Sequence, residues 1–96
     1  MIRSFGNPVA DDLFNDRNSS ATRQFPPDVR RGAQRKLQYL NAATKLQDLN
    51  ALPGNRLEAH KGQLKELYAT RINAQWRVVF KWEDGGATEV AVVDYH

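Results

Sequence analysis

The last third of the chain limits the possible folds most, because it contains three runs of strand-forming sequence. These runs are rich in β-branched and aromatic side chains and cover residues 67–72, 75–82 and 88–95. Asn73 and Ala74 leave room for only a tight turn between the first two runs. Gly85 and Gly86 supply the positive φ angles that a second turn needs. The sequence therefore predicts an antiparallel meander of three strands.

The central run should have two different faces, because successive side chains of a strand point to opposite sides of a sheet. Its even-numbered positions are all apolar and share one face: Trp76, Val78, Phe80 and Trp82. The odd-numbered positions include the cations Arg77 and Lys81. We expect one face to pack against a core, with Trp82 in that core, and the other face to display positive charge.

The clearest helix should begin at Pro26-Pro27-Asp28 and run to about Asn41. Its apolar residues recur at spacings of four, four and three and form one stripe: Val29, Ala33, Leu37 and Leu40. The opposite face is basic and contains Arg30, Arg31, Arg35 and Lys36. A solvated helix face is the commoner explanation of such a pattern, so we place no catalysis there.

Two shorter helices flank this one. Asn7 can cap a helix around residues 9–14, with Pro8 in its first turn. Thr44 can cap another helix, in which Leu46 and Leu49 face inward, and residues 53–55 should end it. Residues 17–24 show no clear period and are expected to form a loop or an irregular extension of the first helix.

The order of these elements predicts an α+β fold in a single domain over residues 1–96. Helices that precede a meander pack most economically on one face of a small antiparallel sheet, and residues 2–5 could add a strand. A chain of 96 residues can fold alone, and its lack of cysteine excludes disulfides. No apolar stretch is long enough for a signal peptide or a membrane span, so we expect a cytoplasmic protein with no membrane contact.

Residues 56–63 read as a polar loop between the helices and the sheet. The loop contains His60, Lys61 and Gly62. Loops on a rigid scaffold often carry function, but a connector with an incidental histidine is the preferred interpretation of these residues alone.

Taken together, several segments resemble the HigB branch of the RelE/ParE toxin superfamily, in their order and spacing. They are Pro53–Ala59, Lys61–Gly62, Arg71–Asn73, Gln75–Phe80 and Asp94–His96. The resemblance implies a RelE-like fold and a ribosome-dependent messenger RNA endonuclease held inactive by a helix-turn-helix antitoxin. It implies no cofactor, and contact with DNA only through the antitoxin.

Carried onto this chain, the resemblance implies a catalytic set, with Arg71 and His60 binding substrate: Lys61, Arg77, Asp94, Tyr95 and His96. The chain departs from the family at two places. Glu58 stands where relatives have a loop histidine, and a histidine occurs two positions later, at His60. Gln63-Leu64 replaces a common Asp-Arg pair and removes one cation.

The chemistry of these residues agrees with RNA cleavage without a metal. The reaction needs a base for the 2′-OH, cations for the phosphorane and an acid for the leaving oxygen. Histidine can act as base or acid near neutral pH, and Lys61, Arg71 and Arg77 can bind phosphate. The two histidines lack a surrounding carboxylate cluster, so no metal site is expected. Two alternatives stay open: a ParE-like toxin that inhibits gyrase by binding, and an inactive homologue that only binds antitoxin or RNA.

Overall fold

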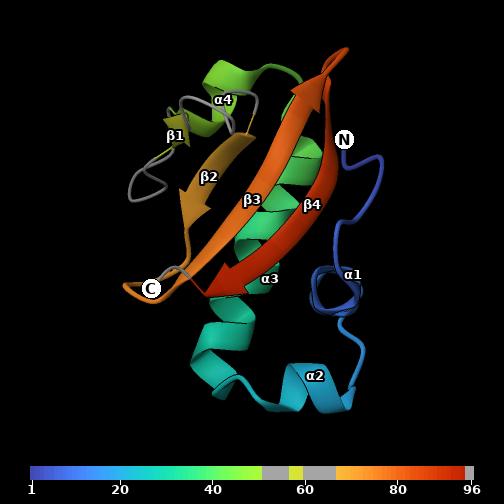
Figure 1. The fold of residues 1–96 in the computed structure, drawn as a ribbon, viewed down its shortest axis with the longest axis vertical. Coiled ribbons are helices and arrows are strands. Elements are labelled where there is room, and N and C mark those ends of the chain that lie inside the picture. The colour runs from blue at the N-terminus through green and yellow to red at the C-terminus, as the bar shows by residue number, and fades with distance from the viewer. Residues whose placement is uncertain (51–56, 60–66, 95–96) are drawn as a thin grey trace.

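The chain folds into four helices and four strands in a computed structural model that describes residues 1–50, 57–59 and 67–94 (Figure 1). The elements are α1 Pro8–Phe14, α2 Ser20–Arg23, α3 Pro27–Ala42, α4 Leu46–Asn50, β1 Glu58–Ala59, β2 Leu67–Arg71, β3 Trp76–Glu83 and β4 Gly86–Asp94. Helix α3 crosses one face of the sheet, as Figure 1 shows. The predicted α+β class is confirmed.

The sheet is antiparallel throughout, with the strand order β1-β2-β3-β4. The predicted meander corresponds to β2, β3 and β4. The prediction that residues 56–63 form a loop was wrong at Glu58 and Ala59, which pair with Ala69 and Tyr68 as strand β1. Two residues are too few to show a strand pattern in the sequence. They form a strand because the edge of β2 offers backbone hydrogen-bonding partners.

The two turns of the meander differ. Asp84 and Gly85 join β3 to β4 with φ angles of 51° and 75°, which confirms the predicted positive-φ hairpin turn. Asp84, and not Gly86, takes the other positive-φ position, and Gly86 begins β4. The turn from β2 to β3 is longer than the two residues expected, because β2 ends at Arg71 and β3 begins only at Trp76. The Asn73 side chain organises it by accepting hydrogen bonds from the N–H groups of Gln75 and Trp76.

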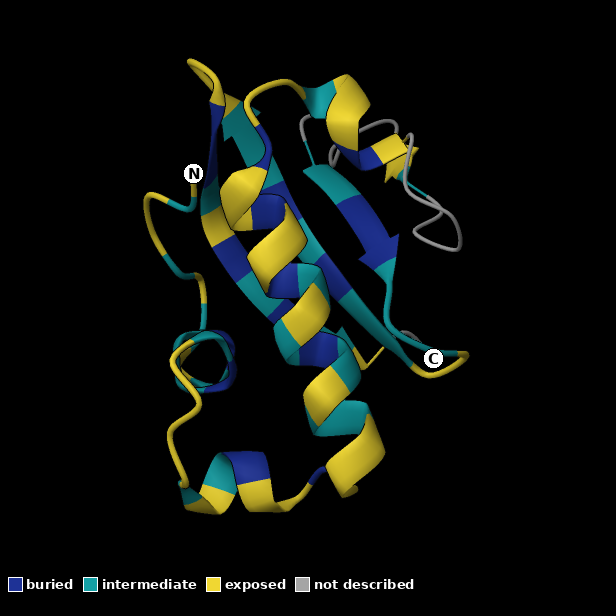
Figure 2. Cartoon of the chain, turned by 180° about the vertical axis from the view of Figure 1, so that it is seen from behind, coloured by how far each residue is buried: buried dark blue, intermediate teal, exposed yellow. Residues whose placement is uncertain are grey.

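The core lies between α3 and the sheet, as Figure 2 shows by the buried stripe on α3 and the buried residues of β3 and β4. Leu37 of α3 and Val78 and Phe80 of β3 have no exposed surface. Trp82 is partly buried against this cluster, which confirms its predicted place in the core. The alternation along β3 is therefore what the sequence indicated.

The N-terminal residues run beside β4 without forming a regular strand. Ile2 and Phe5 make isolated parallel bridges with Ala87 and Val90. Glu89 lies between these bridges with a φ of 52°, and a Cβ atom on Gly6 would lie 2.7 Å from the Glu89 carbonyl oxygen. A kinked partner strand that approaches this closely interrupts the ladder, which is why the expected added strand is incomplete.

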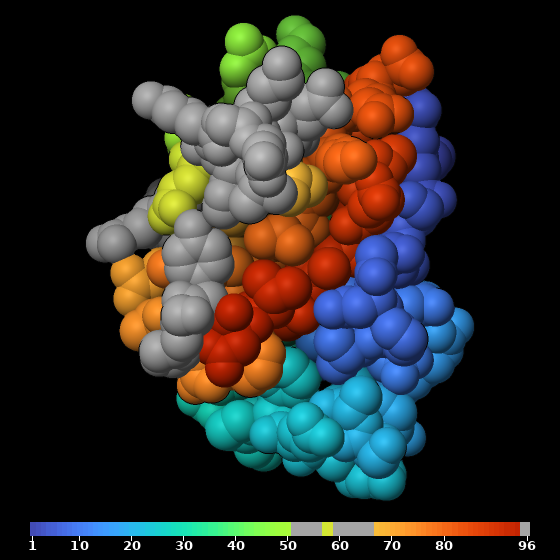
Figure 3. All heavy atoms as spheres, in the orientation of Figure 1, coloured from blue at the N-terminus to red at the C-terminus, as the bar shows by residue number. Residues whose placement is uncertain are grey.

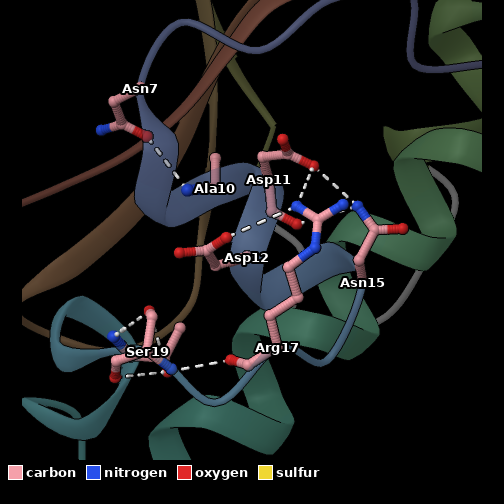
Figure 4. Close-up of polar contacts among 8 residues, drawn as sticks. Asn7, Ala10, Asp11, Asp12, Asn15, Arg17 and Ser19 are labelled. Carbon is pink, nitrogen blue, oxygen red and sulfur yellow. Dashed lines mark hydrogen bonds and ion pairs between the residues drawn. The ribbon is translucent and has the colours of Figure 1, made fainter.

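Helix α1 begins as predicted, because the Asn7 side chain accepts a hydrogen bond from the Ala10 N–H and Pro8 occupies the first turn (Figure 4). The Asn7 amide also donates to the Val92 carbonyl, which attaches α1 to β4. The prediction of a loop or irregular extension over residues 17–24 was wrong at residues 20–23. Ser19 and Thr22 form a reciprocal cap that starts a separate helix, α2.

Helix α4 presents Leu46 and Leu49 to the core as predicted, but Thr44 does not cap it as expected. The Asp48 carboxylate instead reaches back and accepts hydrogen bonds from the N–H groups of Lys45 and Thr44 and from the Thr44 hydroxyl. The hydrogen bond from the Lys45 N–H, followed by the bond from the Thr44 N–H, lowers the pKa of Asp48. The predicted stop at residues 53–55 lies outside the described residues.

Candidate functional site

Arg71 and Arg77 face each other directly across strands β2 and β3. The next pair along this ladder, Thr70 and Val78, is buried on the α3 side of the sheet. Because side chains alternate, the two arginines lie on the opposite face. Figure 3 shows that face, where atoms of β3 and β4 reach the surface. Like charges placed directly opposite each other destabilise a sheet, and two cations on one face can together bind a polyanionic ligand.

The Arg77 side chain is held at the β2–β3 turn. Its Nη1 atom donates hydrogen bonds to the carbonyl oxygens of Asn73 and Trp76, at 2.5 and 3.2 Å. Both acceptors belong to the turn that the Asn73 side chain organises. These backbone carbonyl groups therefore fix the position of the Arg77 guanidinium. A guanidinium group carries five N–H donors.

Asp94 lies opposite Trp76 in the final register pair of β3 and β4. It is exposed, and its Oδ2 atom accepts a hydrogen bond of 3.0 Å from the Gln75 amide. Trp76 belongs to the same face as Val78, so Asp94 leaves the sheet on the α3 side while Arg77 leaves it on the other. The β2–β3 turn joins the two positions, because its residues bind both side chains.

Three of the predicted site residues are thus placed by the structure: Arg71, Arg77 and Asp94. The predictions for His60, Lys61, Tyr95 and His96 lie outside the described residues, so the single basic surface that would unite them stays a prediction. Sequence reasoning missed the contribution of Gln75. Its bond to Asp94 joins residues 19 positions apart in the chain, and no local pattern signals such a contact.

Within the described ranges, no three His, Cys, Asp or Glu residues lie close enough to hold a metal ion. In the same part of the chain, no helix combines the length and apolar character that a membrane crossing requires.

A second charged surface lies on the helical half. A cavity of about 180 Å³ opens between the end of α1, α2 and the start of α3, and both Arg30 and Arg31 line it. Arg17, on the same cavity, pairs with Asp11 and Asp12 at 3.1 and 3.4 Å (Figure 4). The hydrogen bond to Asp11, followed by the charge of that carboxylate, raises the pKa of Arg17.

The basic side of α3 continues beyond this cavity. Arg31 and Arg35 are exposed, whereas Arg30 and Lys36 are half-buried. Burial, followed by the charge of Arg35, lowers the pKa of Lys36. Among the ion pairs of the described residues, none involves these four cations. Within the described residues, the face therefore concentrates positive charge without a close carboxylate partner.

Comparison with known proteins connects this fold to a family of toxins. A family model described as "RelE-like toxin of type II toxin-antitoxin system HigB" matches residues 3–96. Toxin HigB-1 of Vibrio cholerae serotype O1 is 42% identical over 65 residues, which cover 68% of each chain. An uncharacterized protein of Haemophilus influenzae is 30% identical over 61 residues, or 64% of this chain and 60% of its own length.

Solved structures of similar fold include two that contain YoeB of Staphylococcus aureus, at low sequence identity. The YoeB-YefM complex matches with a TM-score of 0.62 and 19% identity over 100% of this chain and 98% of that one. The YoeB dimer matches with a TM-score of 0.59 and 20% identity over 99% and 97%. At this identity the likeness shows the fold alone, which is a small α+β fold.

The family match over nearly the whole chain is more specific than the fold. The protein belongs to the HigB-like family of RelE-like toxins of type II toxin-antitoxin systems. The predicted resemblance is confirmed.

Proposed function

We propose that the protein is a ribosome-dependent endoribonuclease that cleaves messenger RNA during translation and so inhibits protein synthesis. The observation that carries the proposal is the direct pairing of Arg71 with Arg77 on the face away from α3. Two like charges in register oppose sheet formation, whereas a phosphate backbone can accept charge-assisted hydrogen bonds from both guanidinium groups. Membership of the toxin family supports the same activity.

The proposed reaction is an in-line transfer within the RNA. A base removes the proton from a 2′-OH, the resulting oxygen attacks the adjacent phosphorus, and the bond from phosphorus to the 5′ oxygen breaks. An acid protonates that leaving oxygen, and the products carry a 2′,3′-cyclic phosphate and a 5′-OH. Arg71, Arg77 and Lys61 would stabilise the negative charge of the phosphorane, which is where fixed cations accelerate phosphoryl chemistry most.

The acid and the base come from the C-terminal residues in this proposal. His96 is suited to either role because an unperturbed imidazole titrates near pH 6.5, and His60 could bind substrate. Asp94, held at the strand end by Gln75, would orient the neighbouring Tyr95 and His96. The mechanism needs no cofactor and no metal.

Mapping of messenger RNA ends in a purified translation system tests the activity. New 5′-OH ends should appear inside translated codons when the protein and ribosomes are both present, and should be absent when either is omitted. Cleavage of free RNA at the same rate would overturn ribosome dependence. Intact messages with arrested DNA supercoiling would support a ParE-like toxin, and intact messages without growth arrest would support an inactive homologue.

We further propose that a small helix-turn-helix antitoxin restrains the protein in its own cell and that the toxin reaches DNA only through it. The relative from Staphylococcus aureus was solved in complex with YefM. The basic side of α3 is the proposed docking surface, because its cations have no carboxylate partner within the described residues. Because ribosomes are the proposed target, we expect the protein to act in the cytoplasm.

Co-expression with the neighbouring gene product tests this partner. The pair should co-purify and growth should be restored. Replacing Arg31 and Arg35 together by glutamate should weaken the complex and restore toxicity, whereas Lys45→Ala, an exposed cation beyond the end of α3, should change neither. Unchanged antitoxin binding by the double variant would mean that the antitoxin docks on another surface. Failure of the wild-type pair to associate would mean that the neighbouring gene product is not the partner.

A further inference from the structure

We infer that Gln75 is a positioning residue for Asp94, and that the β2–β3 turn acts as one device that orients both Asp94 and Arg77. The inference rests on the proposed nuclease function and adds to it a residue that the family resemblance does not assign to the site. It starts from the hydrogen bond of 3.0 Å from the Gln75 Nε2 atom to the Asp94 Oδ2 atom.

Gln75 is itself held in place by the turn. The Asn73 Oδ1 atom accepts hydrogen bonds of 2.9 and 2.8 Å from the N–H groups of Gln75 and Trp76. The Ile72 N–H closes the turn by donating to the Trp76 carbonyl at 3.0 Å. A side chain that accepts from two successive N–H groups restricts the backbone of those residues. The amide of Gln75 therefore starts from a fixed backbone position.

The same turn binds the other charged group. Arg77 donates to the carbonyl oxygens of Asn73 and Trp76, so Asn73 contributes its side chain toward Gln75 and its carbonyl to Arg77. The turn therefore holds both a cation and a carboxylate in place, although the two groups lie on different faces of the sheet. A catalytic site needs such fixed relative positions, because a misplacement of about 1 Å can cost a factor of roughly 100 in rate.

The fold does not need this bond. Gln75 and Asp94 are both exposed, and exposed hydrogen bonds contribute little to stability because water replaces them. The strands on either side are already joined by the ladder that ends at Trp76 and Asp94. A purely structural role would leave catalysis unaffected by the loss of the Gln75 amide, and this difference makes the inference testable.

The test compares Gln75→Ala with Gln47→Ala, a matched exposed glutamine on α4. Single-turnover cleavage on saturating programmed ribosomes should slow about 10- to 100-fold in Gln75→Ala and stay unchanged in Gln47→Ala. Ribosome affinity should be the same in both. Gln75→Glu should slow cleavage further, because its carboxylate repels Asp94 and donates no hydrogen bond at neutral pH. Both alanine variants should keep a melting temperature within about 4 °C of wild type.

A spectroscopic arm observes the contact directly. The NMR signal of the Asp94 side-chain carboxyl carbon should titrate at higher pH in Gln75→Ala than in Gln47→Ala, because a donated N–H stabilises the carboxylate. Slower cleavage without this change would mean that Gln75 touches RNA itself, and the change without slower cleavage would make the contact merely structural; either result overturns the inference. A wild-type protein that cleaves nothing would refute the proposed function instead, while the carboxyl signal still reports on the contact.

The Asn73 side chain offers a second check through a conservative replacement. Asn73→Asp keeps an oxygen that can accept both N–H groups and should retain most of the activity. Asn73→Ala removes the acceptor, loosens both Gln75 and Arg77, and should lose more activity than Gln75→Ala. Equal rates for the aspartate and alanine variants would show that the turn positions neither group.

Discussion

The two faces of strand β3 have different surroundings, although their residues alternate along one segment. Toward α3, Val78 and Phe80 are fully buried among apolar side chains. Away from α3, Arg77 lies opposite Arg71, and Lys81 pairs with Glu89 of β4 at 2.9 Å. The first face is stabilised by apolar burial, and the second accepts an unfavourable pairing of charges.

The contrast teaches that a small domain can keep stability and function apart without separate segments. Substitutions on the α3 face should change folding and leave the activity of each folded molecule intact. Substitutions on the opposite face and at the adjoining strand ends should change activity and leave folding intact. The predictions that follow test this separation.

The largest effect should come from deleting His96, which follows the strand end at Asp94 in sequence. Removing a positioned acid or base typically costs a factor of roughly 10² to 10⁴ in rate, so cleavage and growth arrest should be abolished. Removing one terminal residue should cost about 1 kcal/mol of stability or less. Message cleavage, thermal unfolding and antitoxin binding measure the three consequences. A truncated protein with nearly normal cleavage would remove His96 from the site.

Next in size is Phe80→Ala on the α3 face. The side chain is fully buried and lies 5.9 Å from the Tyr68 ring and 6.5 Å from the Trp82 ring, between centroids. Truncating a buried phenylalanine costs about 3–5 kcal/mol through lost burial and the cavity left behind. Denaturant unfolding should show this loss, and cleavage per folded molecule should stay near that of wild type. A comparable loss in specific activity would break the separation of the two faces.

A smaller effect on activity is expected for Arg71→Ala. Arg71 contributes one of two paired cations, and the loss of one phosphate contact of this kind should slow cleavage about tenfold. Stability should stay equal or rise, because the variant removes the charge opposite Arg77. The same assays with Arg23→Ala, an exposed cation on α2, provide the control. A clear loss of stability in Arg71→Ala would show that this pair serves the fold after all.

The smallest effect should be that of Glu89→Gln, which removes the charge that pairs with Lys81. Both side chains are substantially exposed, at 36% for Lys81 and 60% for Glu89. Exposed ion pairs contribute about 1 kcal/mol at most and are screened by salt. Unfolding at low and high salt should differ less for the variant than for wild type. A loss well above 1 kcal/mol would mean that charge on this face also supports the fold.

Much of the fold could be predicted because its signals are local. The two-residue period of β3 and the apolar stripe of α3 each identified an element and its buried face. Asn7 and Pro8 marked the start of α1 correctly. The errors at α2 and β1 have a common cause, since both are short segments whose polar residues carry no periodic signal. Ser19 and Thr22 form their cap only as a pair, and β1 exists only as a partner of β2.

The candidate site divides in the same way. Residue type and family resemblance suggested Arg71, Arg77 and Asp94 as candidate site residues, and their role stays a prediction. The sequence could not show that Arg71 pairs with Arg77, because register depends on the length of the turn between β2 and β3. Nor could it show the bond between Gln75 and Asp94, which closes across two strands.

The sequence alone determined the α+β class, the strands of the meander, the two faces of β3 and the toxin family, because periodicity, caps and motif order are properties of neighbouring residues. The tertiary structure decided what distant residues share. It sets the N-terminal segment against the kink at Glu89, and it ties Arg77 and Asp94 to one turn. Such contacts depend on how strands align in space, and a one-residue change of register would remove them without altering any local pattern.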